Sequence, residues 1–513
     1  MARLKEYNGH YCESEYEYAF IGFLEAEGWK YSSGNNIRRV TKRDVLIADD
    51  FKKFIADTNP DLTEDEVTQI YDNVRLVGAE SDFATLHKVY GWMVNGVQFT
   101  QQDGLPRMIP LIDFDNWDKN IFRVVNQFTV EYTNNGQKEN RRPDVLLFVN
   151  GMPLCVVELK NPANANATIY DAWEQINIRY WRDIPHLLHY CPLACISDGV
   201  KTRLGTVRTP YEHFYAWRRV TERDAVSTLP FAETETMIKG VYAPERFLEI
   251  FRDYIYFQDS IYDSDEVEIV CRYPQFFAAR LLKQSIIKSV VEKSGKGGTY
   301  FGATGCGKTY TMAFLARQLA LRCIDIPEIG SPTIILIVDR DELQKQGSKL
   351  FTKSKEFLNL GEVSVVKNRT QLRQELGARQ SGGFYICTIQ KFCDREDDKI
   401  GLINDRQNII CFSDEAHRTQ LEHSKKIQFS KDADENMKAM VSKPYAKVLK
   451  EAFPHATFVG FTGTPIAETY QTFGDEIDRY TMDQAVADGL TVSIKYHPRI
   501  AKVLLDNKKV KEI

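Results

Sequence analysis

The sequence predicts an α/β protein of two successive modules, the second built on a parallel β-sheet. Three observations support this fold class. Four apolar runs of strand length, separated by helix-like stretches, lie between residues 332 and 462, as expected for buried parallel strands joined by helices. A glycine-rich loop at residues 302–309 lies between an apolar lead-in and a helix-like run. Upstream, residues 122–159 are rich in β-branched and aromatic side chains and follow a helical stretch.

Composition limits the possible number of domains and the class of protein. A chain of 513 residues with 43% hydrophobic residues can bury several cores, and we expect about three domains. The net charge of -5 gives no global argument for nucleic-acid binding, so any DNA contact has to come from local basic surface. The ten cysteines lack zinc-site spacing, and the sequence lacks a signal peptide or a long uncharged apolar run. We therefore expect a reduced, cytoplasmic protein that does not span a membrane.

Helices open the chain. Residues 14–28 predict an amphipathic helix, and Glu17 has the helical spacing to face inward and add a carboxylate to a cleft; the alternative is a solvated first turn. Residues 43–77 predict two more helices, the second begun by a capping box of Thr63 and Glu66. The apolar positions of the first helix are Phe20, Ile21 and Leu24.

A β-rich segment follows. Residues 122–133 predict one strand, which turns at residues 134–136. Residues 144–149 and 154–159 then predict a hairpin around the Asn-Gly pair at 150–151. We expect an antiparallel meander.

This hairpin carries the first candidate site. Alternation places Glu158 and Lys160 on the same face of their strand, and the tight turn brings Asp144 beside them. Two carboxylates and a lysine can bind Mg²⁺ and stabilise charge on a scissile phosphate, with Asp144 and Glu158 as the metal ligands. The spacing is that of PD-(D/E)xK nucleases. The alternative, an exposed ion pair, fits poorly with an apolar strand in which charges are costly.

A helix predicted over residues 171–181 can line the same cleft. Gln175 can orient water or a metal ligand, whereas Arg179 and Tyr180 can contact a DNA phosphate. The alternative is a solvated helix face.

The glycine-rich loop carries the second candidate site. Its G-x4-G-K-[ST] pattern allows backbone N–H groups to surround phosphates, while Lys308 reaches the β and γ phosphates and Thr309 binds Mg²⁺. About 30 residues upstream, Gln275 can hydrogen-bond adenine and favour ATP. The candidate loop residues are Gly302, Thr304, Gly305, Gly307, Lys308 and Thr309.

Two later strands end in polar residues. In the strand that ends in Asp-Glu-Ala-His, Asp414 can hold Mg²⁺ and Glu415 can polarise the water that attacks the γ phosphate. In the next, Thr462 and Thr464 can relay the nucleotide state to a DNA groove.

As a set, these motifs resemble those of superfamily 2 helicase-type motors: a Q-motif at 272–275, motif I at 302–309, motif II at 414–417 and motif III at 462–464. A nuclease joined to such a motor resembles the restriction (R) subunit of type I restriction-modification enzymes. The local sequence of residues 142–162 also resembles that family.

The resemblance implies a restriction-endonuclease-like α/β domain over residues 1–258 and a RecA-like parallel-sheet lobe over 259–490. Residues 491–513 would begin the connection to a second motor lobe outside this chain. It also implies that ATP and Mg²⁺ drive translocation along double-stranded DNA and cleavage away from a recognition sequence. Methyltransferase and specificity subunits would be the partners.

Two departures from the family pattern stand out. The family often has Gln-x3-Tyr, but the residue four after Gln175 is Arg179, and the tyrosine follows at 180. The chain also ends before a second lobe, so we expect a fragment that binds ATP, hydrolyses it poorly and does not translocate.

Two other functions compete with this interpretation. One is an ATP-dependent DNA or RNA repair or remodelling helicase with a degenerate nuclease module; the other is a nucleotide-gated docking subunit. The presence of Asp144, Glu158 and Lys160 together favours the nuclease.

Overall fold

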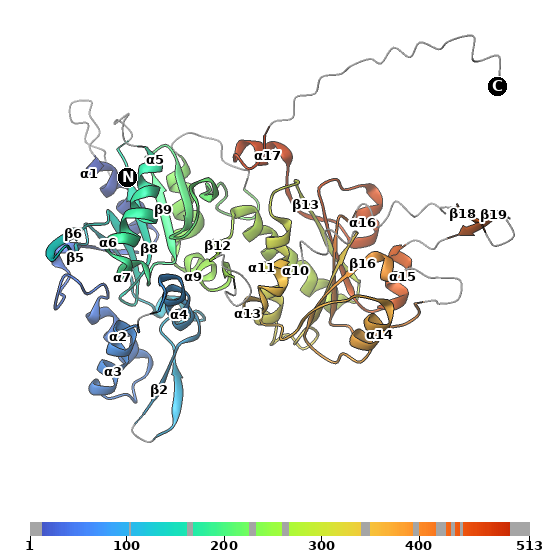
Figure 1. Cartoon of the computed structure of the whole chain (residues 1–513), viewed down its shortest axis with the longest axis horizontal. Coiled ribbons are helices and arrows are strands. Elements are labelled where there is room, and N and C mark those ends of the chain that lie inside the picture. The colour runs from blue at the N-terminus through green and yellow to red at the C-terminus, as the bar shows by residue number, and fades with distance from the viewer. Residues whose placement is uncertain are drawn as a thin grey trace, which may run out of the picture.

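The computed structural model describes residues 13–78, 80–101, 104–161, 168–224, 232–258, 266–339, 349–392, 400–416, 427–431, 437–441 and 445–492. Two large β-sheets organise them, one in each half of the chain (Figure 1). The fold is thus mixed α/β, with parallel strands in both sheets.

The first sheet has the order β1-β4-β7-β8-β9-β10. Strands β4, β7 and β8 pair antiparallel, as expected for a meander, but β1 with β4 and β8 with β9 pair parallel. The antiparallel meander predicted over residues 122–159 is confirmed for β4, β7 and β8, whereas the whole sheet is mixed because the helical crossover after β8 returns the chain parallel to it. The strands are β1 Lys30–Ser33, β4 Phe122–Asn126, β7 Val145–Val149, β8 Met152–Leu159, β9 Leu193–Ser197 and β10 Thr202–Thr206.

The prediction of a single strand over residues 122–133 was wrong. The chain leaves the sheet after β4 at Gln127, whose φ of 52° is incompatible with a strand. It then forms a separate hairpin of β5 (Val130–Asn134) and β6 (Gln137–Arg141). The predicted turn is confirmed, because Asn135 and Gly136 have φ values of 49° and 78°.

Helices pack around the first sheet. The capping box is confirmed: the Thr63 N–H donates to Glu66 Oε2 (2.9 Å), and the Glu66 N–H donates to Thr63 Oγ1 (3.2 Å). A small hairpin, β2 (Val97–Thr100) with β3 (Pro106–Ile109), extends beyond α4. The helices are α1 Glu13–Ala26, α2 Ala48–Thr58, α3 Glu64–Arg75, α4 Asp82–Asn95, α8 Ala232–Met237 and α9 Pro244–Asp253.

The second sheet has the order β15-β16-β14-β17-β20-β13-β21, and all its pairings are parallel. The four apolar runs are confirmed as β14, β16, β17 and β20. The helix expected from Asp341 begins outside the described residues. The strands are β13 Lys296–Gly302, β14 Thr333–Val338, β15 Val363–Val365, β16 Phe384–Thr388, β17 Ile409–Asp414, β20 Thr457–Thr462 and β21 Glu476–Tyr480.

Helices also pack around this sheet, and α10 and α11 contact each other closely. They include α10 Tyr273–Glu292, α11 Lys308–Arg322, α13 Lys355–Leu358, α14 Arg369–Gly377, α15 Tyr445–Ala452, α16 Ala467–Phe473 and α17 Met482–Ala487.

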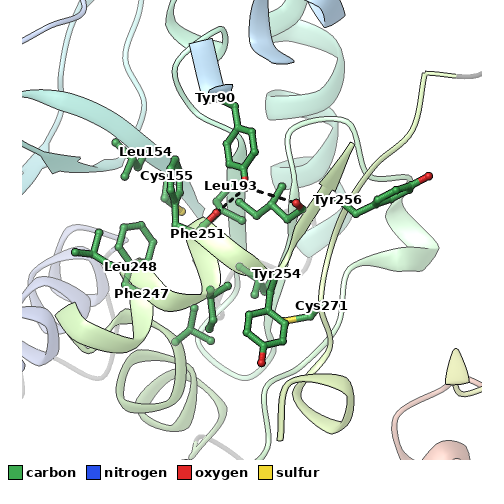
Figure 2. Packing of buried hydrophobic residues seen from close by; sticks show 14 of the residues in the cluster. Tyr90, Leu154, Cys155, Leu193, Phe247, Leu248, Phe251, Tyr254, Tyr256 and Cys271 are labelled. Carbon is green, nitrogen blue, oxygen red and sulfur yellow. Dashed lines mark hydrogen bonds between the residues drawn. The ribbon is translucent and has the colours of Figure 1, made fainter. Parts of the chain in front are cut away.

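One hydrophobic core continues between the two halves. Helix α9 contributes Phe247 and Phe251, and its last turn leads into Tyr254 (Figure 2). The Tyr254 ring packs on Phe276 and Phe314 of the second half. The Tyr90 hydroxyl donates to the carbonyl of Phe251 at 2.8 Å. Aromatic packing of this kind holds the halves together.

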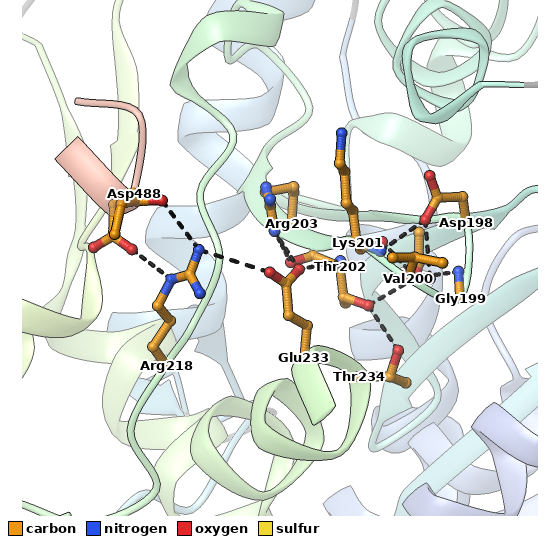
Figure 3. Close-up of polar contacts among 12 residues, drawn as sticks. Asp198, Gly199, Val200, Lys201, Thr202, Arg203, Arg218, Glu233, Thr234 and Asp488 are labelled. Carbon is orange, nitrogen blue, oxygen red and sulfur yellow. Dashed lines mark hydrogen bonds and ion pairs between the residues drawn. The ribbon is translucent and has the colours of Figure 1, made fainter. Parts of the chain in front are cut away.

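A partly buried polar link joins the same two halves. The Arg218 guanidinium lies between Glu233 at the start of α8 and Asp488 just after α17, with N–O distances of 3.7 and 2.5 Å (Figure 3). Glu233 also accepts from the Thr202 N–H of β10 (3.0 Å), and Asp488 accepts from the Tyr480 hydroxyl of β21 (2.6 Å). Arg218 therefore connects an edge strand of each sheet.

Candidate functional site

The first site lies where β7 and β8 meet. Asp144 directly precedes β7, Glu158 lies within the fully buried strand β8, and Lys160 follows it. The Asp144 N–H is 3.4 Å from Glu158 Oε1, and Lys160 Nζ is 3.9 Å from Glu158 Oε2. The Leu159 N–H donates to Asp144 Oδ2 at 2.8 Å. The predicted hairpin thus brings the three predicted residues together.

Glu158 carries a buried carboxyl group, and within the described residues one of its two oxygens forms no hydrogen bond. Its side chain is fully buried, and Oε2 has no hydrogen-bond partner in the described part of the chain. Burial, and next the charge of Asp144, raise the pKa of Glu158 well above its usual value, while Lys160 opposes the shift. A carboxyl of this kind releases its proton when a cation takes the place of that proton.

This environment fits a divalent cation. The orphaned Glu158 oxygen beside Asp144 offers hard oxygen ligands of the type that Mg²⁺ prefers. Among the described residues, no cluster of three or more His, Cys, Asp or Glu could hold a metal ion. Water and substrate oxygens would therefore have to supply the other ligands, as is usual for Mg²⁺.

A π-helical turn carries the neighbouring polar residues. The expected regular helix is instead α5 (Ile169–Glu174), a π turn (Gln175–Tyr180) and α6 (Trp181–Asp183). Because a π turn takes up one more residue than an α turn, Gln175 and Tyr180 face each other although five positions apart. The Gln175 Nε2 donates to the Tyr180 hydroxyl (2.8 Å), which donates to Glu158 Oε1 (2.6 Å).

The π turn accounts for the departure from the Gln-x3-Tyr pattern. Lys160 Nζ donates to Gln175 Oε1 at 3.0 Å, so Lys160, Gln175, Tyr180 and Glu158 form one continuous chain of hydrogen bonds. Arg179 occupies the extra position, is about half exposed and pairs with Glu174 at 3.2 Å.

Glu17 points inward rather than into solvent. Its side chain is 5% exposed, and its carboxylate accepts from Asn126 Nδ2 and Gln127 Nε2, both at 2.6 Å. The Gln127 N–H donates to the Asp144 carbonyl at 3.0 Å. Glu17 therefore supports the segment that leads to Asp144. Sequence reasoning missed both amides, because no periodic pattern marks polar residues at the end of a strand and just after it.

The second site lies at the carboxyl edge of the parallel sheet. The loop between β13 and α11 turns through Gly305 and Gly307, whose φ values of 83° and 84° favour glycine. Thr304 is exposed, and Thr309 is half-buried in the first turn of α11. Lys308 Nζ donates to the carbonyl of Gly302 at 3.2 Å.

Asp414 ends β17 opposite this loop. Lys308 Nζ is 3.9 Å from Glu415 Oε1, and the Glu415 N–H donates to Asp414 Oδ1 at 3.0 Å. Burial raises the pKa of Asp414 to about 6, while Lys308 opposes the shift. Glu415 has a φ of 49°, a conformation that is uncommon outside glycine and concentrates at functional positions. His417 lies outside the described residues.

Strand β20 lies between β13 and β17, so its end meets both motifs. Thr462 is buried, and its hydroxyl accepts from the Thr464 N–H at 3.1 Å. Gly463 lies close to the loop: a Cβ added there would come within 3.4 Å of Thr304 Oγ1. Sheet order thus brings the two motifs and this turn together.

Gln275 lies beneath the loop. Its side chain is 4% exposed; Oε1 accepts from the Arg272 N–H (2.9 Å), and Nε2 is 3.4 Å from the carbonyl of Gly307. The amide therefore caps α10 and touches the loop. Its contact with adenine stays a prediction.

Comparisons with known proteins agree with the two-site organisation. Residues 11–213 match the family described as type I restriction enzyme R protein N terminus, and residues 274–513 match SWI2/SNF2 ATPase. In the described residues, every helix is too short or too polar to cross a membrane.

Curated relatives match nearly the whole chain. The HindI type I restriction enzyme endonuclease subunit of Haemophilus influenzae is 31% identical over 94% of this chain and 46% of its own length. A protein of Methanocaldococcus jannaschii, provisionally named the MjaIXP endonuclease subunit, is 30% identical over 96% and 46%. The chain therefore spans about half the length of the curated relatives it matches.

A solved fragment from Vibrio vulnificus YJ016, provisionally named an HsdR subunit, is 16% identical. It covers 73% of this chain and 57% of its own, with a TM-score of 0.27. Together, the two family matches and the curated relatives show that the chain is an HsdR-like protein, similar to the endonuclease subunits of type I restriction enzymes.

Proposed function

We propose that this chain provides the nuclease and an ATP-binding motor region of a type I restriction enzyme R subunit. In the assembled enzyme it would use ATP to move along double-stranded DNA and cut both strands away from the recognition sequence. Methyltransferase and specificity subunits would supply recognition. The observation that carries the proposal is the convergence of Asp144, Glu158 and Lys160 in a chain that also brings a phosphate-binding loop to Asp414 and Glu415.

The domain assignments extend this proposal. Residues 1–258 would form a restriction-endonuclease-like domain, residues 259–490 a RecA-like motor lobe, and residues 491–513 the start of a connection. The mixed sheet that carries the carboxylates supports the first assignment. The all-parallel sheet, with its loop at a strand end, supports the second.

The nuclease residues have separable roles. When bound, Mg²⁺ supplies charge neutralisation and an activated water, and Asp144 and Glu158 would hold it. Tyr180 fixes Glu158 Oε1 and leaves Oε2 for the cation, while Gln175 orients Lys160. Lys160 would then stabilise the negative charge that develops on the scissile phosphate.

For the residues of the second site, ATP would be the substrate. Lys308, now held by Gly302, would swing to the β and γ phosphates, and the loop N–H groups with Thr304 and Thr309 would surround them. With a pKa of about 6, Asp414 is ionised at neutral pH, as a magnesium ligand must be. Glu415 would polarise the attacking water, while Thr462 and Thr464 would sense the nucleotide state.

The first test is cleavage by the assembled enzyme. An R subunit that contains this chain is combined with its methyltransferase and specificity subunits and given Mg²⁺ and unmethylated plasmid carrying the recognition site, with and without ATP. Glu158→Gln should abolish cutting and spare ATPase activity. Glu64→Gln, which changes an exposed carboxylate on α3 in the same half of the chain, is the control and should cut normally.

Two outcomes would contradict the proposal. ATPase activity without cutting by the wild-type enzyme would favour a remodelling helicase with a degenerate nuclease module. Cutting that survives Glu158→Gln would place the nuclease site elsewhere.

A further inference from the structure

A small arginine-lined cavity adjoins the nuclease site. Its volume is about 210 Å³, and none of its lining residues is a carboxylate. We call it the arginine pocket, and it is lined by Asn140, Arg141, Arg142, Gln175, Arg179 and Tyr180. A cavity with three guanidinium groups, two amides and a hydroxyl offers many hydrogen-bond donors, which is the chemistry that recognises an anion.

The pocket shares a wall with the catalytic residues. Gln175 and Tyr180 line it, and the same two side chains hydrogen-bond Lys160 (3.0 Å) and Glu158 (2.6 Å). Arg142 is only two residues before Asp144, and the intervening Pro143 is buried. An anion in the pocket would therefore lie next to the catalytic residues without occupying their position.

The positive charge of the pocket is only partly neutralised. Arg141 pairs with the largely buried Asp183 at 2.6 Å, and Arg179 pairs with Glu174 at 3.2 Å. Arg142 is exposed, and its guanidinium forms no ion pair with any residue in the described ranges. Arg142 is thus the guanidinium most available for an incoming ligand, and Asp183 holds its neighbour Arg141 in place.

We propose that the arginine pocket binds a backbone phosphodiester of the DNA strand that is cut, adjacent to the scissile phosphate. This inference rests on the proposed nuclease function. Arginine is suited to phosphate because its planar fork makes two parallel hydrogen bonds. Contacts of this type position DNA without reading its sequence, which matches cleavage away from a recognition site. Arg142 and Arg179 would contact the phosphate directly, and Arg141 would add to the local positive potential.

A neighbouring cavity provides the contrast. It has a volume of about 570 Å³ and shares Arg141, but its lining includes the carboxylates Glu139 and Asp183. Arg43 lines this larger cavity, is exposed and does not line the arginine pocket. Arg43→Gln is therefore a matched control for the loss of one exposed arginine from the same part of the protein.

The test measures DNA binding by this chain as a function of salt. Fluorescence anisotropy of a labelled duplex is recorded in EDTA, so that cutting cannot interfere, for wild type and for Arg142→Gln, Arg179→Gln and Arg43→Gln. Loss of one phosphate contact should reduce the slope of log K against log salt by about 0.9 and weaken binding at 0.1 M salt by roughly eightfold. We expect this for the two pocket variants and an unchanged slope for Arg43→Gln.

Each possible result of this test either supports or contradicts the proposal for the arginine pocket. Wild-type slopes in both pocket variants would overturn the proposal, as would an equal fall for Arg43→Gln, which would indicate diffuse surface charge. If one pocket variant misfolds, as judged by its thermal transition, the other still decides. If Glu158→Gln abolishes plasmid cutting but both pocket variants keep the wild-type salt slope, only the proposal for the arginine pocket is refuted. Absence of cutting by the wild-type assembly would sink the proposed function.

Discussion

Glu158 should make the metal-free protein less stable at neutral and alkaline pH. A carboxyl whose pKa is raised on folding contributes most to stability while it is protonated, below its pKa in the unfolded chain. That contribution is lost as the pH rises through the folded-state pKa. The side chain is fully buried, Oε2 has no hydrogen-bond partner among the described residues, and Asp144 is its neighbour.

Glu158→Gln keeps the shape and removes the charge, so in EDTA at pH 8 the variant should be more stable than wild type. A buried, unsatisfied polar group costs about 1–3 kcal/mol, and more when it is charged. For a module of this size, that corresponds to a rise in Tm of roughly 2–12 °C. The difference should shrink as the pH is lowered toward 4, where Glu158 holds its proton in both the folded and the unfolded state.

Magnesium should reverse the order of stability of wild type and Glu158→Gln. A ligand that binds only the folded state at a hundred times its Kd stabilises that state by about 2.7 kcal/mol, so Mg²⁺ should raise the Tm of wild type and leave Glu158→Gln nearly unchanged. The assay is thermal unfolding followed by circular dichroism between pH 4 and 9, in EDTA and in Mg²⁺, with Glu174→Gln as control. A variant less stable than wild type at every pH in EDTA would refute the reasoning.

Three further predictions follow from particular contacts. Lys308→Ala should abolish ATP binding, measured calorimetrically, without lowering Tm; unchanged affinity would remove this loop from the nucleotide site. Deleting Arg179 should convert the π turn to a regular α turn and retain the Gln175–Tyr180 contact, so plasmid cutting should fall no further than it does in Arg179→Gln. Tyr180→Phe, in contrast, should lower cutting about 10- to 100-fold through loss of a hydrogen bond to a charged group. A folded but inactive deletion variant would show that the π turn itself is needed. Arg218→Met leaves the largely buried carboxylate of Asp488 without its cation, which costs about 3–5 kcal/mol, while Glu233 keeps its ion pair with Arg203. The loss of this link should separate the unfolding of the two halves into distinct calorimetric transitions; a single unaltered transition would contradict this.

The local pattern predicted much of the fold and part of the candidate site. The hairpin that brings Asp144 to Glu158 was predictable because alternation fixes the face of each side chain and an Asn-Gly pair fixes the turn. The apolar runs β14, β16, β17 and β20 were predictable because strands covered on both faces are apolar throughout.

The features that the sequence did not predict share one cause. The break at Gln127, the parallel entry of β9 and the π turn at Gln175–Tyr180 each depend on what packs against the segment, and not on the segment alone. The π turn forms hydrogen bonds with Glu158 of β8 and with Lys160 just after it, at least 15 residues away in the sequence. A periodic pattern carries no information about such partners.

By itself, the sequence determined the two sets of reactive groups, because their chemistry resides in residue types at short spacings: Asp144 with Glu158 and Lys160, and the loop at 302–309. Only the tertiary structure decided which groups distant in the sequence join them. The order of strands placed Thr462 between the loop and Asp414, the crossover helix placed Arg179 beside Arg142, and Arg218 joined the two halves. The physical reason is that such contacts join segments distant in sequence, and their geometry is set by the packing of the whole sheet.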